Sequence, residues 1–252
     1  MSRALTGQSS VVVAPLSALM QKVVPAALFE SYIETISIGD TRDRDLFTEK
    51  LMTGGYQRVP LVEKEGEFSL RGNIIDLFPP LYPSPFRMEL IGDEIESIRQ
   101  FDPLTQRSLK EVVDFTLAPA GEVLLSGESK RRVLRNLRSR FNESGVSRAR
   151  RDRLIDGIEH DLFSLANLQL LPLFYGDLAA GGMTNGLGTL LEYLPTGTAM
   201  ICESPGVMER AAEETGNEAD RIVRKAEDEG KIFLEKEYFL ASWEELLGRA
   251  SS

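Results

Sequence analysis

The chain has 252 residues, 42% of them hydrophobic, and a formal net charge of −10. This length suits one large folded domain or two smaller ones. Cys202 is the one cysteine, which excludes an internal disulfide and fits a reducing, cytoplasmic compartment. The sequence offers no apolar run of membrane-spanning length, and its polar start does not fit a signal peptide.

The first predicted elements alternate between strand and helix. Residues 10–14 have the run of valines typical of a buried strand, which Pro15 ends, and a helix is expected after it. A short strand is expected at 36–40, followed by a helix that Gly54-Gly55 closes. This order of elements favours α/β packing.

From residue 56 to residue 117 the apolar positions alternate, as they do in strands with one buried face. Gly92-Asp93 is predicted to be the tip of a hairpin. In one of these strands, Phe68 points to one side and Arg71 to the other, and Gly72 then bends the chain. We therefore expect a compact module built from a sheet and a helix.

The second half of the chain is predicted to be mainly helical. Apolar stripes predict helices within 129–170, and a glycine-rich passage at 176–188 is expected to be a mobile loop. A buried strand is expected at 199–202, and a long charged helix follows it. A strand near 238–240 and a helix that Ser242 caps are expected at the end.

These elements predict an α/β protein with a compact sheet-plus-helix module that is flanked by different material. A helical segment is expected to follow the module. The expected boundaries are 1–37 for a first α/β segment, 38–119 for the module, 120–188 for the helical segment with its loop, and 189–252 for a last α/β segment.

The sequence does not contain a catalytic motif. A phosphate-binding loop requires G-x-x-x-x-G-K-[S/T], and Gly230-Lys231 lacks the partner glycine and is followed by an isoleucine. Asp93-Glu94 fits a hairpin tip better than a metal site. His160, the one histidine, is far in sequence from Cys202, and neither residue has the spacing of a zinc site. We therefore expect no catalysis by this chain alone, no cofactor and no metal.

Positive charge is concentrated in one part of this acidic chain. Residues 130–153 contain ten Lys or Arg against two carboxylates, so this block carries +8 and the remainder −18. Such a block either binds phosphates with salt-dependent affinity or is a solvated face. Phe141 is its one aromatic residue, so stacking on single-stranded nucleic acid is not supported. The candidates for DNA contact are Arg131, Arg132, Arg135 and Arg138.

Arg58 and Arg71 are predicted to project together from one exposed face of the sheet. Two rigidly held guanidinium groups suit the binding of a partner's carboxylates better than catalysis. The alternative is that both are ordinary surface residues paired with Glu63, Glu67 or Glu89.

This region resembles the module shared by the excision-repair protein UvrB and the bacterial transcription-repair coupling factors. The resemblance rests on two stretches, GYQRVPLVEKEGEFSLRGNIIDLFPP and FRMELIGDEIESIRQFDPLTQRSL. Their residues at E-G-E-F and Q-R-S-L are more similar to those of the coupling factors than to those of UvrB. The flanking stretches VVVAPLSALMQKV and YLPTGTAMICESP resemble the same family, so the resemblance covers most of the chain and is weakest at 129–170.

The resemblance implies a non-catalytic piece from the N-terminal region of a longer, ATP-driven translocase that removes stalled RNA polymerase and recruits repair proteins. The implied fold is a degenerate P-loop-ATPase-like, UvrB-like α/β domain with the module inserted. The implied partner of the module is UvrA, while RNA polymerase and DNA are contacted through other regions of the full-length protein.

By motif position, the resemblance places UvrA-binding residues at Arg58 and Arg71, with Phe78 as an apolar contact. Ser69 stands where UvrB has a further arginine, so part of the charge pairing differs. Two alternatives stay open: a DNA-binding module that uses the basic helices of 130–153, or a fragment of a UvrB-type helicase.

Overall fold

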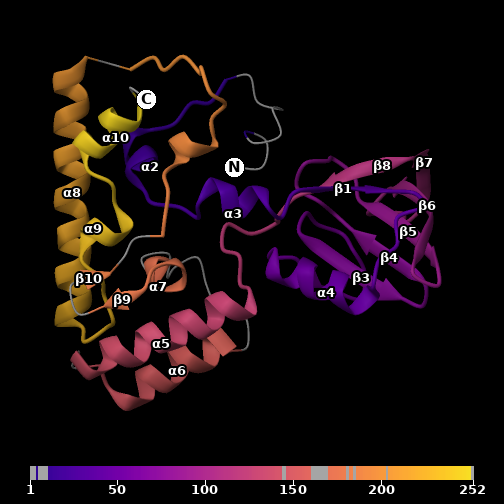
Figure 1. Ribbon diagram of the computed structural model, residues 1–252, viewed down its shortest axis with the longest axis horizontal. Coiled ribbons are helices and arrows are strands. Elements are labelled where there is room, and N and C mark those ends of the chain that lie inside the picture. The colour runs from indigo at the N-terminus through magenta and orange to yellow at the C-terminus, as the bar shows by residue number, and fades with distance from the viewer. Residues whose placement is uncertain are drawn as a thin grey trace. The chain divides into compact units, whose positions relative to one another are not determined.

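The computed structural model describes residues 4, 11–143, 146–159, 170–179, 182–183, 186–202 and 204–250. These residues form two compact units (Figure 1). The sheet unit comprises residues 27–125, and the helical unit comprises the described residues of 4–26 and 126–250.

Besides most of a short helix at its boundary, the sheet unit contains one ten-residue helix and eight strands. They are β1 (Glu34–Ser37), α4 (Arg44–Thr53), β2 (Gln57–Arg58), β3 (Glu67–Arg71), β4 (Ile74–Leu77), β5 (Phe86–Ile91), β6 (Glu94–Phe101), β7 (Ser108–Val112) and β8 (Asp114–Leu117). The short helix α3 (Ala26–Glu30) begins at its boundary.

The helical unit is built mainly from helices of very different length. They are α2 (Leu16–Met20), α5 (Gly127–Glu143), α6 (Arg148–Glu159), α7 (Pro172–Tyr175), the 3-10 helix η2 (Leu190–Tyr193), α8 (Pro205–Asp228), α9 (Lys236–Phe239) and α10 (Trp243–Ala250). Two short strands, β9 (Leu178–Ala179) and β10 (Gly182–Met183), pair with each other.

A six-stranded sheet in the order β2-β3-β4-β5-β6-β7 is the framework of the sheet unit. β2 lies parallel to β3, and every other neighbouring pair in this sheet is antiparallel. The predicted bend at Gly72 joins β3 to β4, and the predicted hairpin tip at Gly92-Asp93 joins β5 to β6. β1 and β8 form a separate antiparallel pair.

One face of the six-stranded sheet is buried together with α4 and the β1–β8 pair. Phe86 of the sheet stacks on Phe115 of β8, with 4.4 Å between the ring centroids, and Tyr82 meets Phe86 edge-on. Aromatic pairs of this kind add to the stabilisation that apolar burial gives. The other buried sheet residues on this face are Phe68, Ile75, Leu77, Met88, Leu90, Ile95 and Ile98.

The chain makes a close backbone contact where α4 ends, at the predicted glycine pair. The backbone N–H of Gly54 donates to Lys50 at 2.9 Å, and Gly55 has a φ of +86°. The backbone of Gly121 passes so near that a Cβ at Gly55 would lie 2.7 Å from the Gly121 Cα. Both the dihedral and the contact therefore require glycine at position 55.

Two buried strands that the sequence predicted are not present in the structure. Residues 11–14 and 199–202 have no regular secondary structure, and Ile201 is 96% exposed. Within the part of the chain that the structure describes, neither segment has a neighbouring strand, so its backbone groups cannot join a ladder. Cys202 is exposed for the same reason. The fold is mixed α/β, as predicted, and the ATPase-like character of the flanking domain stays a prediction.

The other predictions for this unit had mixed outcomes. The long helix after residue 204 is confirmed as α8, and Ser242 caps α10 by accepting from the Glu245 N–H at 3.1 Å. The prediction of a strand near 238–240 is wrong, because these residues lie in α9 and directly after it. The helices within 129–170 are confirmed as α5 and α6, whereas His160 and residues 161–169 lie outside the described residues.

The glycine-rich passage at 176–188 is partly described, and there it contains the β9–β10 pair. The division of the chain into four segments stays a prediction. Among the described helices, none has the length and apolar character needed to cross a bilayer.

We expect Gly55→Ala to lower the stability of the sheet unit far more than Gly39→Ala. Both glycines have φ near +90°, but a Cβ at Gly39 has nothing within 4 Å. The dihedral alone costs about 1–2 kcal/mol, and the contact at Gly55 adds about 1–3 kcal/mol more. Thermal unfolding of both variants measures the difference, and equal losses would contradict the close contact.

Candidate functional site

The strand register places a row of polar side chains across the face of the sheet opposite the buried core. In antiparallel pairing, residues in register lie side by side on the same face. Five residues of β3 to β7 are in register in this way: Ser69, Asp76, Arg87, Arg99 and Glu111. A second row on the same face contains Arg71, Ile74, Glu89 and Ser97. We call these two rows together the polar face.

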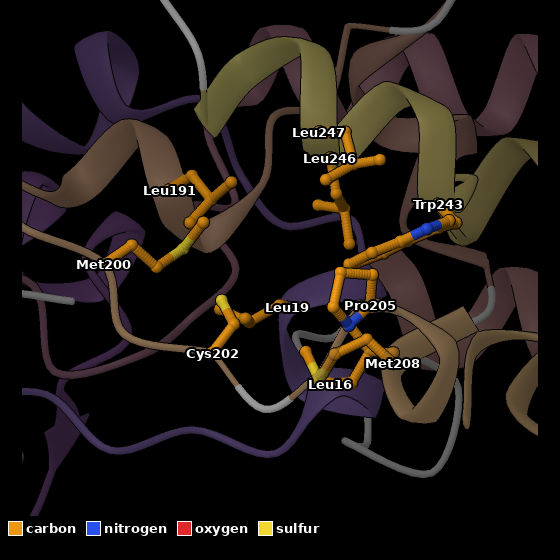
Figure 2. Close-up of a pocket in the computed structure, with 10 residues that line it drawn as sticks. All are labelled: Leu16, Leu19, Leu191, Met200, Cys202, Pro205, Met208, Trp243, Leu246 and Leu247. Carbon is orange, nitrogen blue, oxygen red and sulfur yellow. The ribbon is translucent and has the colours of Figure 1, made fainter. Parts of the chain in front are cut away.

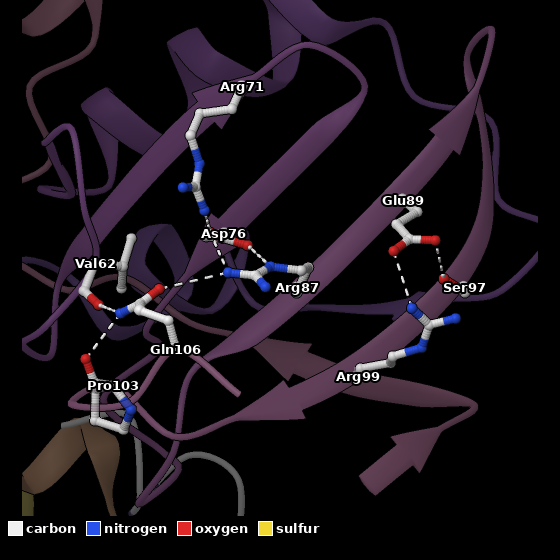
Figure 3. Close-up of polar contacts among 9 residues, drawn as sticks. All are labelled: Val62, Arg71, Asp76, Arg87, Glu89, Ser97, Arg99, Pro103 and Gln106. Atoms are coloured by element: carbon white, nitrogen blue, oxygen red, sulfur yellow. Dashed lines mark hydrogen bonds and ion pairs between the residues drawn. The ribbon is translucent and has the colours of Figure 1, made fainter. Parts of the chain in front are cut away.

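Asp76 is a buried residue of the polar face that anchors two arginine side chains. Its carboxylate is fully buried, and Arg87 donates to it from Nε at 2.7 Å and from a terminal nitrogen at 2.9 Å. Arg71 donates to the same carboxylate at 2.5 Å (Figure 3). A buried carboxylate is tolerated only when it is paired and hydrogen-bonded. Two guanidinium groups around one carboxylate leave this group of three with a net charge of +1.

Arg87 is held in place from several sides. Its guanidinium carbon lies 4.7 Å from the ring centroid of Phe101, and a terminal nitrogen donates to Gln106 at 3.4 Å. Gln106 has a φ of +60° and donates its own amide to the backbone oxygens of Val62 and Pro103, as Figure 3 shows. The hydrogen bonds with Asp76 raise the pKa of Arg87, an effect that burial partly opposes.

Arg71 is the accessible member of the positive group. Its side chain is 47% exposed, whereas that of Arg87 is 17% exposed. A guanidinium has five N–H donors, so the one hydrogen bond to Asp76 leaves several donors on the exposed side. The prediction that Arg71 points out of the core is therefore confirmed.

A second group of charges lies farther along the polar face. Arg99 donates to Glu89 at 2.9 Å and to Glu111 at 3.2 Å, and Ser97 donates its hydroxyl to Glu89 at 3.2 Å. One arginine between two carboxylates gives this group a net charge of −1. Arg87 and Arg99 are directly in register, and the like-charge repulsion expected there is reduced because each turns to its own carboxylates.

The prediction that Arg58 and Arg71 share one face is wrong. Arg58 is in register with Phe68, and Arg71 lies three residues beyond Phe68 on the same strand. Side chains alternate between faces along a strand, so Arg58 lies on the face of Phe68 and Arg71 on the opposite face. Arg58 stays exposed because β2 is a short strand at the edge of the sheet.

Phe78, the predicted apolar contact, is not at the surface. It is 6% exposed and packs with Val62 and Phe101 in a small cluster. A partner could reach its ring only by opening that cluster. In this structure, Phe78 belongs to the packing between Val62, in the loop before β3, and Phe101 of β6.

The arginines predicted for DNA contact lie on α5 in the helical unit. Arg132 pairs with Glu128 at 2.8 Å, and Arg135 pairs with Asp177 at 3.0 Å. Arg131 and Arg138 are exposed. Part of the positive charge counted in the sequence is thus neutralised within the unit.

The helical unit also contains an apolar cavity of about 250 Å³ (Figure 2). The sequence did not predict it because its walls come from distant segments. They carry no charged side chain, so the cavity supplies neither an acid nor a base. The lining residues are Leu16, Leu19, Leu191, Met200, Cys202, Pro205, Met208, Trp243, Leu246 and Leu247. Among the residues that the structure describes, no group of three or more potential metal ligands is found.

Asp76 and Arg87 were not predicted from the sequence as functional residues. A signal was present, because Asp76 interrupts the apolar run from Ile74 to Phe78. A carboxylate in a buried strand is rare unless it is paired, and Arg87 is the partner that the hairpin register supplies.

Comparison with known proteins finds a family model that matches the region of this surface. Residues 35–122 match the UvrB interaction domain family, and this range includes the whole polar face. Over 225 residues, 89% of this chain, the sequence is 33% identical to the transcription-repair-coupling factor of Myxococcus xanthus, of which it covers 18%.

Two further relatives have the same name. The chain is 28% identical to the transcription-repair-coupling factor of Bacillus subtilis over 242 residues, which is 92% of this chain and 20% of that protein. It is 27% identical to that of Staphylococcus aureus over 234 residues, 90% of this chain and 19% of that protein. The chain therefore spans about a fifth of the length of these relatives.

We expect Asp76→Asn to destabilise the sheet unit by about 3 kcal/mol, because removing one partner of a buried ion pair leaves the others uncompensated. Chemical denaturation measures the change. Asp93→Asn, at the exposed hairpin tip, is the matched control and should change stability by less than about 0.5 kcal/mol. Equal stability of the two variants would show that Asp76 does not hold the polar face.

Proposed function

We propose that this chain, a relative of the transcription-repair-coupling factors with a UvrB interaction domain at residues 35–122, docks the excision-repair protein UvrA. It does so without catalysing a reaction, as part of the N-terminal region of a longer protein. The observation that carries the proposal is Arg71, half-exposed and anchored on a buried carboxylate.

The anchored arginine reduces the cost of binding. A free arginine side chain loses rotamer entropy when it forms an ion pair, whereas Arg71 is already oriented by its hydrogen bond to Asp76. Its outward donors match the two oxygens of a carboxylate. An acidic side chain of UvrA is therefore the group that the polar face would bind.

Arg58 is proposed as a separate contact. It lies on the other face of the sheet but at the edge strand β2, where a partner that extends around the edge reaches it. The polar face and Arg58 would then bind different side chains of UvrA.

The absence of a phosphate-binding loop in the sequence supports the non-catalytic part of the proposal. Coupling of repair to stalled RNA polymerase, and contact with DNA, would depend on the remaining four-fifths of a full-length protein. This chain would supply the link to the excision machinery.

A second candidate function is DNA binding by the helical unit. Arg131 and Arg138, exposed seven residues apart on α5, favour it. The helical spacing puts them on one side of the helix, so both would contact the same stretch of phosphates. A UvrB-type helicase fragment has less support, because the relatives named above are coupling factors.

We expect Arg71→Ala to weaken UvrA binding at least tenfold, since arginines at the centre of interfaces contribute about 2 kcal/mol or more. The melting temperature should change little, because Arg87 still pairs with Asp76. Titration calorimetry with UvrA measures the affinity, and Arg224→Ala on α8 is the control. An unchanged affinity would refute the role of Arg71.

The opposite placement of the two arginines leads to another prediction. Arg58→Ala and Arg71→Ala should have additive effects on the binding free energy, within about 0.5 kcal/mol, because residues without a shared partner act independently. The double variant, titrated beside the two single variants, tests this. A coupling above about 1 kcal/mol would mean that both arginines bind one group of UvrA.

A further inference from the structure

The polar face carries two groups of opposite net charge. The positive group, defined above, is Arg71, Asp76 and Arg87, and the negative group is Glu89, Arg99 and Glu111. Neighbouring strands lie about 4.8 Å apart, so the centres of the two groups are roughly 10–15 Å apart. The face is therefore a fixed pattern of charge with a direction across the strands.

The negative group contributes little to folding. The side chain of Glu111 is 76% exposed, and it lies on β7 at the free edge of the sheet. Its partner Arg99 already has Glu89. Exposed ion pairs of this kind stabilise a protein by about 0–1 kcal/mol. The second carboxylate thus remains available to another cation.

The carboxylates of the negative group differ from Asp76 of the positive group in their exposure. Asp76 is enclosed by two guanidinium groups and cannot meet a partner, whereas both carboxylates of the negative group are at the surface, with Glu89 at 36% and Glu111 at 76% exposure. The polar face therefore offers donors at one end and acceptors at the other.

We infer that the negative group receives a basic side chain of the docked partner, so that UvrA is bound by both ends of the charge pattern. This inference rests on the proposed function. It requires the surface of UvrA to carry an acidic side chain opposite Arg71 and a basic side chain opposite Glu111, roughly 20 Å away, because β3 and β7 are four strand spacings apart.

Two opposite charges define an orientation that one charge does not. A partner turned by half a rotation would place its acidic side chain against Glu89 and Glu111, and its basic side chain against Arg71. Juxtaposed like charges cost several kcal/mol at an interface, so this orientation is rejected. The negative group is thus a specificity determinant rather than a source of affinity alone.

The test compares charge reversals by titration with UvrA. Glu111→Lys should weaken binding at least fivefold and slow association. Glu213→Lys changes the charge of the chain by the same amount at an exposed position on α8, and it should leave the affinity unchanged. The melting temperature of the Glu213 variant should match the parent, and that of the Glu111 variant should fall only slightly, because the reversal replaces an exposed ion pair with Arg99 by a pair of like charges.

The outcomes separate this inference from the proposed function. If Arg71→Ala weakens binding and Glu111→Lys does not, the inference is overturned and the proposed docking stands. Equal losses in the Glu111 and Glu213 variants would also overturn it, since the effect would then be one of net charge. If Arg71→Ala has no effect while Glu111→Lys weakens binding, the negative group remains a contact and the proposed role of Arg71 fails.

Discussion

The buried carboxylate of Asp76 is the interaction on which the account of the sheet unit depends. It lies in the middle of the six-stranded sheet, where burial without partners would cost several kcal/mol. Arg87 satisfies it twice, and Arg71 joins from the neighbouring strand. The same contacts that make the carboxylate tolerable also fix the direction of Arg71, so stability and the proposed docking have a common physical cause.

Much of the sheet unit could be predicted from the sequence, because alternation within one strand is a local property. The hairpin at Gly92-Asp93 and the outward direction of Arg71 were both predicted in this way. Arg58 was placed on the wrong face because its direction relative to Arg71 depends on the pairing of two strands. Register between strands is set by packing and turn geometry, which periodicity does not contain.

In the helical unit, too, the failed predictions concern contacts between segments that are distant in the sequence. Residues 11–14 and 199–202 are as apolar as central strands, and the sequence alone predicted that they are buried. In the structure they have no strand beside them among the described residues, and Ile201 is exposed. Apolar composition shows that a segment favours burial, but the partner that would bury it has to be present in the fold.

The structure of this chain bound to UvrA would test the central claim most directly. The account predicts that UvrA covers the polar face, with a carboxylate of UvrA within hydrogen-bond distance of Arg71 while Arg71 keeps its contact with Asp76. A complex in which UvrA contacts neither Arg71 nor the polar face would contradict the account.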